Sequence, residues 1–434
     1  MKERIAIIAG YRSAMAKAGG AFKNINASDL GARILREVIL RSKIAVNQID
    51  EVIVGNVANP ADSANIARVV ALKAGLPKSV PAFSVHRNCA SGMEAFTTAT
   101  SKILNDEAKI IAVGGVESMT NIPLLYNKKM TEFFSRLSKA KTTGEKLLVL
   151  KDFRLNMLQP VIGLVQGLTD PISGLIMGCT AENVARDFKI SRLEQDQFAL
   201  RSHALATKAI NDGIFREEIV AVFNNDEKNS LMIEEDEGVR KEQKIEDLQK
   251  LKAYFEKNTG SVTVGNSSQV TDGACFAILM KESQAKAMQA EIGGEIIGYL
   301  RDFAYAGLEP SRMGLGPVFA TKKLFDKTNL SLNDIDLFEI NEAFCAQVLG
   351  CVKAFASPEF CKEHFNLDSP IGEIALDKLN VNGGAIALGH PVGMSGARII
   401  IHLLRELRRR SLHRGLATLC IGGGQGGACI VETS

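Results

Sequence analysis

The feature that most constrains the fold of this 434-residue chain is an internal repeat of one helix–turn–strand plan. Residues 27–56 predict an amphipathic helix, a short turn and an apolar strand, and residues 313–341 predict the same elements in the same order. IDEV at 49–52 and IDLF at 335–338 occupy the same place in the two copies. Chance similarity between α/β units is the alternative explanation. We favour duplication, with the active site where the two halves meet.

Each copy continues toward a reactive residue set among small residues. Cys89 follows the first copy, and after it come a small-residue helix (ASGMEAFTTATSKIL) and a strand ending in glycines (IIAVGG). His390 follows the second copy, with a similar helix (GMSGARIIIHLLREL) and a strand that reaches Cys420 (LATLCIGGG). Strands that alternate with helices predict mostly parallel sheets covered by helices.

Residues 121–261 fit neither copy and predict an inserted loop domain. Its first part mixes basic and apolar residues, and its later part predicts a helix with Ser191 as N-cap, Glu194 in a capping box and Gly213 as stop. The predicted division is therefore 1–120 with 262–292 for the first half, 121–261 for the insert and 293–434 for the second half.

Composition predicts a soluble enzyme and excludes several other classes. Hydrophobic residues make up 46% and charged residues 23%, and a formal net charge of +3 does not by itself indicate nucleic-acid binding. The apolar runs are shorter than the ~18 residues of a membrane span. The chain begins directly with an apparent strand, which leaves no room for a signal peptide. The eight cysteines lack metal-site spacing, so we expect reduced thiols, no metal and a cytoplasmic location.

Cys89 and His390 are the first candidates for catalysis. Cys89 precedes a predicted helix, whose free N–H groups and dipole would favour a thiolate; a buried structural cysteine is the alternative. His390 lies in GHP within a glycine-rich loop that opens a helix, a better place for a base than an ordinary helical surface.

Cys420 ends an apolar strand and leads into Ile421, Gly422, Gly423 and Gly424. These glycines could present backbone N–H groups to a developing oxyanion. The Lys-Ser/Thr of a P-loop is missing, and GxGxxG is absent after the first strand, so nucleotide-dependent oxidoreduction is disfavoured.

Asn341 lies in NEAF directly after the second repeat's strand. A buried asparagine there could hold a water or an oxyanion, and an asparagine that only satisfies a turn is the alternative.

Together these motifs resemble the thiolase family over almost the whole chain. NCASG, NEAF, GHPVGMSG and CIGGGQGG occur in the family's order, and GNSSQVTDGA at 265–274 and MGLGP at 313–317 match two further segments. The resemblance implies an α/β thiolase fold of two duplicated β-α-β-α-β-α-β-β halves. These halves would form a five-layer α-β-α-β-α sandwich with an inserted loop domain.

The resemblance also implies a ping-pong acyl transfer with coenzyme A as a substrate and no other cofactor. Cys89 would attack a 3-oxoacyl-CoA, His390 would keep the sulfur anionic, and Cys420 would move protons. Asn341, through a water, would form one oxyanion hole with His390, and the N–H groups of Cys89 and Gly422 would form the other.

Substrate contacts follow from the same match. Ser268 would contact the pantetheine of CoA, and Met177, Met313 and Phe344 would line the substrate pocket. Many short-chain thiolases carry histidine where this chain has Ile176, so that contact to CoA is not expected here.

The insert at 121–176 is similar to that of β-subunits of the fatty-acid oxidation multienzyme complex, although those subunits usually carry histidine in place of Asn341. This similarity implies a hydratase–dehydrogenase α-subunit as partner and a peripheral membrane contact through 128–165. A homodimer or tetramer is expected, with no nucleic acid bound. We expect a degradative 3-ketoacyl-CoA thiolase; the alternatives are a biosynthetic acetoacetyl-CoA thiolase and a mainly structural or membrane-docking subunit.

Overall fold

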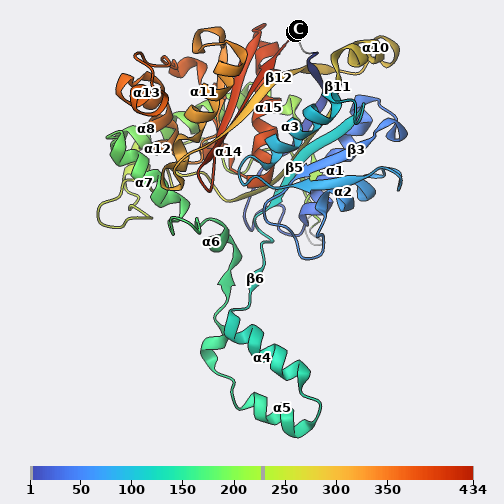
Figure 1. The fold of residues 1–434 in the computed structure, drawn as a ribbon, viewed down its shortest axis with the longest axis vertical. Coiled ribbons are helices and arrows are strands. Elements are labelled where there is room, and N and C mark those ends of the chain that lie inside the picture. The colour runs from blue at the N-terminus through green and yellow to red at the C-terminus, as the bar shows by residue number, and fades with distance from the viewer. Residues whose placement is uncertain (1–2, 226–229, 434) are drawn as a thin grey trace.

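A computed structural model describes residues 3–225 and 230–433 of the chain. Figure 1 shows a layered α/β body, from which one helical hairpin projects. The body contains two half-sheets, helices between them and helices on both outer faces.

The first half-sheet contains the strand of the first repeat. Its order is β4-β3-β5-β11-β1, with β3 parallel to β4 and β5, and β11 antiparallel to β5 and β1. The strands are β1 (Ile5–Ser13), β3 (Glu51–Gly55), β4 (Ala82–Val85), β5 (Ile111–Ser118) and β11 (Thr271–Lys281). Residues on both sides of the insert thus build one sheet.

The second half-sheet repeats this plan in the order β13-β14-β15-β12. Its strands are β12 (Ile296–Gly307), β13 (Leu337–Ile340), β14 (Arg414–Ile421) and β15 (Gln425–Glu432). In the position of β4, the described residues form only an isolated bridge between Phe338 and Leu379. The Asn380 side chain bonds both backbone groups of Ile340 at 2.9 Å and so replaces ladder hydrogen bonds.

The two half-sheets meet edge to edge, because β1 and β12 pair antiparallel. On the outer face of the first half lie α1 (Ala27–Ser42) and α2 (Ile66–Ala74); α11 (Gly316–Thr328) and α12 (Cys345–Ala356) belong to the second half. The two half-sheets supply two layers, the helices between them supply a third, and the helices on the two outer faces supply the fourth and fifth. These are the five layers that the resemblance implies.

Helices α3 (Ser91–Leu104) and α15 (Val392–Arg409) form the central layer and contact each other. A Cβ at Gly92 would lie 2.9 Å from the Gly393 carbonyl oxygen, and one at Gly396 would lie 2.4 Å from the Met93 nitrogen. Glycine is required at these positions because the two helix backbones touch near their N-termini. The turns that precede both helices are thereby brought to the same end of the layer.

Within residues 121–261, the predicted insert, lie α7 (Met177–Asp187) and α8 (Arg192–Asn211). Ser191 caps α8 and forms the predicted capping box with Glu194, and Gly213 follows the helix at a φ of 75°. These sequence predictions are confirmed. The remaining short elements are distributed along the whole chain. They are β2 (Ala16–Lys17), α6 (Gly163–Gly167), β8 (Ile219–Val220), β9 (Val222–Phe223), β10 (Met232–Ile233), α9 (Ile245–Gln249), α10 (Glu282–Ile292), α13 (Pro358–Phe365), α14 (Ala385–Leu388) and 3-10 turns.

Residues 124–162 form the projecting hairpin, called the arm below (Figure 1). Strands β6 (Leu124–Leu125) and β7 (Val161–Ile162) make its stem, and α4 (Lys128–Lys139) and α5 (Thr143–Leu150) make its tip. The tip has a small core of its own, formed by Met130, Phe133 and Val149. Across the described residues, every helix is too short or too polar to cross a membrane.

Candidate active site

Cys89 lies in the turn between β4 and α3. The residue before it, Asn88, has a φ of 44°, and the Ser91 hydroxyl closes the turn by donating to the Asn88 carbonyl at 2.8 Å. The Asn88 amide donates to the Gly422 carbonyl at 2.7 Å. The turn that carries the cysteine is therefore tied directly to the glycine loop of the other half.

The Cys89 thiol is partly exposed and meets two backbone N–H groups. Burial, the larger effect, raises the pKa of Cys89, while hydrogen bonds from the N–H groups of Gly422 and of Cys89 itself lower it. The N–H groups therefore act in the direction that the sequence predicted for a cysteine at a helix N-terminus, and burial acts against them.

Cys420 is completely buried at the end of β14. Burial first, and then the neighbouring Cys89, raise the pKa of Cys420 well above its ordinary value. A Cβ on Gly422 would lie 3.4 Å from the Met177 sulfur and 3.6 Å from the Asn88 amide nitrogen. The structure thus brings Cys89, Cys420 and Gly422 into one site, and Met177 lines it.

His390 lies between α14 and α15, after Gly389 at a φ of 113°. Its Nδ1 is 2.6 Å from the Ser395 hydroxyl, which itself donates to the Pro391 carbonyl at 3.0 Å. Since the one hydroxyl proton is used there, Nδ1 must carry the proton and donate to Ser395. The opposite nitrogen, Nε2, is left with a lone pair, and it has no protein partner among the described residues.

The charge state of His390 follows from its burial. Desolvation, helped by the positive charge of Arg398, lowers the pKa of His390 to about 4. The imidazole is therefore neutral at pH 7, and Nε2 is an available proton acceptor. The position at the end of the α3–α15 pair puts this base in the same region as the Cys89 turn.

Asn341 follows β13 and is fully buried, and both atoms of its side-chain amide lack a protein partner within the described ranges. Buried amides are rarely left unpaired, so this one is suited to holding a water or a substrate oxygen. The next residue, Glu342, accepts from the Asn380 amide at 2.8 Å and from the Ile386 N–H at 3.2 Å. Glu342 thereby ties the Asn341 turn to the segment that leads to His390.

The residues expected at the substrate lie around the same apolar cluster. Met313 and Phe344 are buried together with Cys420, and Met177 packs against them. The Ser268 N–H donates to the Ala343 carbonyl at 2.9 Å, which fixes the segment of Ser268 beside NEAF. Ser267, the residue before Ser268, forms a backbone bridge with Phe344. The Ala343 N–H donates to the Asn341 carbonyl at 3.1 Å, so the segments of Ser268 and Asn341 both lie beside this cluster.

Three supporting residues were missed in the sequence. Asn88 bonds the glycine loop at Gly422, and Ser395 bonds His390. Glu117 accepts from the Gly393 N–H at 2.9 Å and from the Val57 N–H at 3.0 Å. Burial raises the pKa of Glu117 to about 7. Ser395 could have been found, because it lies in the first turn after His390; Glu117 could not, because its partners are distant in sequence.

Comparisons with known proteins agree with this arrangement. The N-terminal domain of thiolase matches residues 5–283, and the C-terminal domain of thiolase matches residues 295–433. The chain therefore belongs to the thiolase family, a family of acyltransferases.

Individual relatives match over nearly their full lengths. A 3-ketoacyl-CoA thiolase of Pseudoalteromonas translucida is 38% identical over 100% of this chain and 97% of its own. The crystal structure of the Bacillus anthracis acetyl-CoA acetyltransferase has a TM-score of 0.85 and 36% identity, covering 100% of this chain and 99% of that one. Human mitochondrial 3-ketoacyl-CoA thiolase in complex with CoA has a TM-score of 0.83 and 33% identity, covering 100% and 98%. The predicted thiolase fold is confirmed.

Proposed function

We propose that this thiolase cleaves 3-oxoacyl-CoA with CoA, giving acetyl-CoA and a shortened acyl-CoA, in fatty-acid β-oxidation. The observation that carries the proposal is that Cys89 and Cys420 lie together, beside the backbone N–H groups of Cys89 and Gly422. Curated relatives of matching length are named 3-ketoacyl-CoA thiolase, which favours the degradative reaction over biosynthetic condensation of acetyl-CoA.

In the first half-reaction, the Cys89 sulfur attacks the keto carbon as its proton passes to His390 Nε2. The bond between carbons 2 and 3 breaks, and the departing enolate of acetyl-CoA takes a proton from Cys420. Asn341, through a water, and His390 stabilise one oxyanion, and the N–H groups of Cys89 and Gly422 stabilise the other. This half leaves an acyl group on Cys89.

In the second half-reaction, Cys420 as thiolate takes the proton of the incoming CoA thiol. The CoA sulfur attacks the thioester carbonyl, and Cys89 leaves and recovers its proton from His390. The resting pKa values support this order, because a neutral thiol and a neutral imidazole are set to exchange a proton only as the carbon–sulfur bond forms.

The test is to incubate the purified protein with CoA and 3-oxoacyl-CoAs of several chain lengths, following loss of the 3-oxoacyl-CoA absorbance. We expect turnover for part of the series and none for Cys89→Ala. Absence of turnover at every length would overturn the proposal. Activity with acetoacetyl-CoA alone would instead favour the biosynthetic alternative.

The same proposal assigns the substrate contacts and the domains. Ser268 contacts the CoA arm, and Met177, Met313 and Phe344 line the substrate pocket, which the shared apolar cluster supports. The loop domain spans 121–261, between the two segments of the first half (1–120 and 262–292), and the second half spans 293–434. Met177→Trp should raise the KM for long acyl chains more than for acetoacetyl-CoA; equal effects at all lengths would contradict the assignment.

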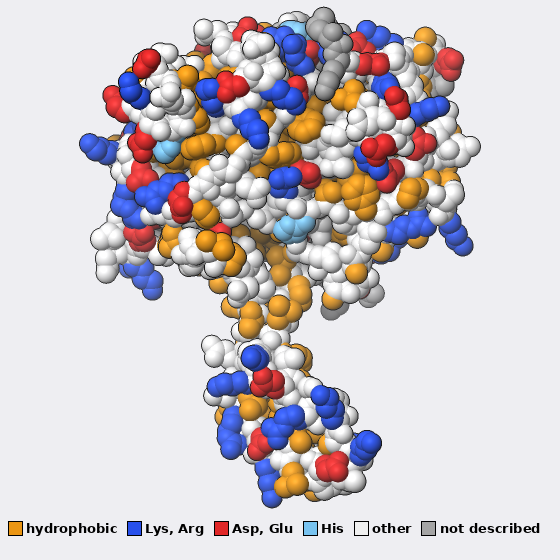
Figure 2. All heavy atoms as spheres, in the orientation of Figure 1, with side chains coloured by type: hydrophobic (Ala, Val, Ile, Leu, Met, Phe, Trp, Pro, Cys, Tyr) orange, Lys and Arg blue, Asp and Glu red, His pale blue; other side chains and the backbone are white. Residues whose placement is uncertain are grey.

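We further propose that the arm docks the protein on anionic membrane, while the body forms a cytoplasmic homodimer or tetramer. Figure 2 shows Lys and Arg side chains spread over the arm with apolar patches between them. Leu147 and Leu148 are 56% and 64% exposed and line a hollow on α5. An exposed apolar face beside basic side chains is suited to a lipid surface.

Vesicle co-sedimentation tests this docking. The wild type should bind vesicles containing anionic lipid, and Leu147→Glu with Leu148→Glu should weaken binding, whereas Leu72→Glu, an exposed leucine on the body, should not. If the arm instead binds a hydratase–dehydrogenase α-subunit, co-purification with that subunit will depend on the leucine pair and vesicle binding will be absent.

A further inference from the structure

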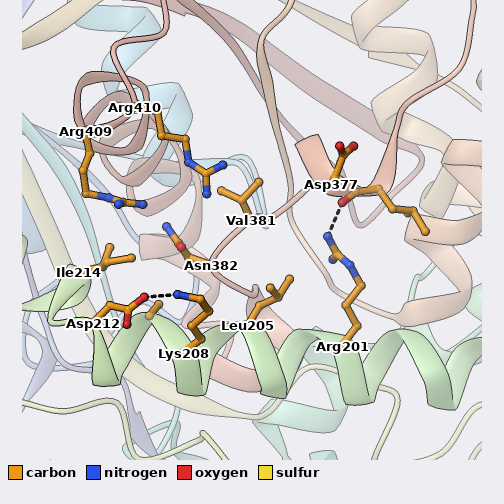
Figure 3. Close-up of a pocket in the computed structure, with 12 residues that line it drawn as sticks. Arg201, Leu205, Lys208, Asp212, Ile214, Asp377, Val381, Asn382, Arg409 and Arg410 are labelled. Atoms are coloured by element: carbon orange, nitrogen blue, oxygen red, sulfur yellow. Dashed lines mark hydrogen bonds and ion pairs between the residues drawn. The ribbon is translucent and has the colours of Figure 1, made fainter.

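A cavity of about 680 Å³ lies between α8, the segment before α14 and the C-terminal end of α15 (Figure 3). This volume is typical of sites for small molecules, which occupy about 300–1,000 Å³. Its lining shares no residue with the candidate catalytic or substrate positions. The established family reaction therefore does not account for it.

The floor of the cavity is apolar. Leu205 from α8 faces Val381 from the opposite segment, and Ile214 lies at one side (Figure 3). Ala209 of α8 also lines the cavity. At the rim, Leu376 leaves 45% of its surface exposed. Exposed leucine beside an apolar hollow indicates a place where an apolar ligand body would remove surface from water.

Cationic groups stand at both ends of this floor. Arg409 and Arg410 occupy one end, and Arg201 lies at the other, near Asp377 (Figure 3). Arg409 and Arg410 both bond the single carboxylate of Glu406, which is buried and also accepts from the Asn382 amide at 2.9 Å. One carboxylate for two guanidinium groups leaves this end positive.

At the other end, Arg201 is incompletely satisfied. Its Nη2 donates to the carbonyls of Leu376 and Leu379, the latter at 2.6 Å, but its Nη1 is buried and without a protein partner in the part of the chain described. Burial lowers the pKa of Arg201, although an arginine remains protonated at neutral pH. A buried N–H donor without a partner is costly, so a ligand acceptor that reached Nη1 from the cavity would be stabilising.

We propose that this cavity is a second binding site, specific for an amphipathic monocarboxylate whose head group lies at Arg201 and whose apolar body lies on the Leu205–Val381 floor. A guanidinium fork matches a carboxylate in shape and charge. A single negative charge fits better than two, because Lys208 is already paired with Asp212 and cannot balance a second charge. The carboxylates of Glu342, Glu339 and Asp377 already act on the Arg201 charge, so they would repel a doubly charged phosphate more strongly than a monocarboxylate.

Calorimetric titration of the full-length protein with octanoate tests the proposal. We expect saturable binding that Arg201→Met weakens about tenfold, the usual effect of losing a hydrogen bond to a charged group. Octan-1-ol should bind more weakly than octanoate by a similar factor. Arg408→Met is the matched control, since Arg408 is exposed on the same end of α15 but pairs with Glu295 at 2.9 Å outside the cavity.

Photo-crosslinking locates the bound octanoate. A diazirine-bearing octanoate should label peptides containing Leu205 or Val381, and Leu205→Trp, which fills the floor, should abolish that labelling. Thermal melting checks that the Leu205→Trp protein is folded, and Arg201→Met gives an independent variant if it is not.

Three outcomes would overturn the proposal: labelling confined to the Met177–Met313 region, equal affinity in Arg201→Met, or inorganic phosphate displacing octanoate at equal concentration. These readouts measure binding rather than thiolysis. Failure here therefore leaves the proposed reaction intact, and loss of the reaction leaves this site intact.

Discussion

The turn that carries Cys89 and the turn that carries His390 occupy corresponding places in the two halves, yet they expose their side chains differently. Cys89 follows a regular strand, is partly exposed and receives backbone N–H groups. His390 follows a short helix, is 7% exposed and has its Nδ1 fixed by Ser395, which leaves Nε2 free of protein partners among the described residues. One duplicated scaffold thus supplies an accessible nucleophile and a dehydrated base.

The difference begins one strand earlier. In the first half, β4 runs directly into the nucleophile turn, whereas in the second half the Asn380 side chain takes over part of the edge pairing. The released segment can then form α14 and bury His390. Duplication fixed the framework, and local changes at the edge position separated the two chemical roles.

The largest expected effect comes from the nucleophile. Cys89→Ala should lower turnover by about 10⁴-fold or more, because covalent catalysis is lost entirely. Mass spectrometry should find no acyl-enzyme in this variant. Cys420→Ala should also slow turnover but leave Cys89 open to alkylation by iodoacetamide, and equal loss of alkylation in both variants would contradict the two roles.

Removal of the unpaired amide should have the next largest effect. Asn341→Ala should lower kcat by about 10²–10³-fold, the usual result of losing an oxyanion donor. KM for the acyl-CoA should change far less, because the amide acts as charge develops. A change in KM alone would show that Asn341 only shapes the turn.

The link between Ser395 and His390 should matter less. Ser395→Ala leaves Nδ1 without its acceptor, at a cost of about 1–3 kcal/mol, and permits the tautomer with the proton on Nε2. We expect kcat to fall about 10–100-fold, in keeping with that energy. Ser395→Thr, which retains a hydroxyl, should recover most of the rate; the idea fails if alanine and threonine behave alike.

A pH profile sharpens the comparison between the two turns. His390 must be unprotonated to accept the Cys89 proton, and its pKa is lowered to about 4, so activity should persist on acidification until the pH approaches 4. The same pKa shift makes the folded protein less stable as the pH falls from 6.5 towards about 4, because the unfolded chain then binds a proton on this histidine and the folded chain does not. An acidic limb of kcat near pH 6.5 would show that His390 is not desolvated during turnover.

The smallest effect is expected far from both turns. Replacing the arm by a short glycine–serine connection should change the free energy of unfolding of the body by less than about 0.5 kcal/mol, as for other surface changes. We expect this small change because the arm has a separate core, formed by Met130, Phe133 and Val149. Thermal melting and turnover of acetoacetyl-CoA measure this, and a large loss in either would make the arm part of the fold.

Much of the fold could be predicted, because duplication leaves the same hydrophobic period in both halves. The caps of α8 were visible in Ser191, Glu194 and Gly213, since capping depends on neighbours in sequence. The pairing of β1 with β12 could not be predicted, because strands pair through backbone hydrogen bonds, which almost any residue type can make. Glu117 was missed for a similar reason, as it accepts from turns of both halves.

By itself, the sequence determined which residue types are available and in what local setting: a cysteine before a helix, a histidine in a glycine loop and a cysteine at a strand end. Only the tertiary structure decided their charge states. Desolvation depends on what surrounds a side chain from every direction, and burial raises the pKa of Cys89 against the N–H groups at the helix terminus that the sequence displays. The same burial makes His390 a neutral base and leaves the Asn341 amide without a protein partner among the described residues.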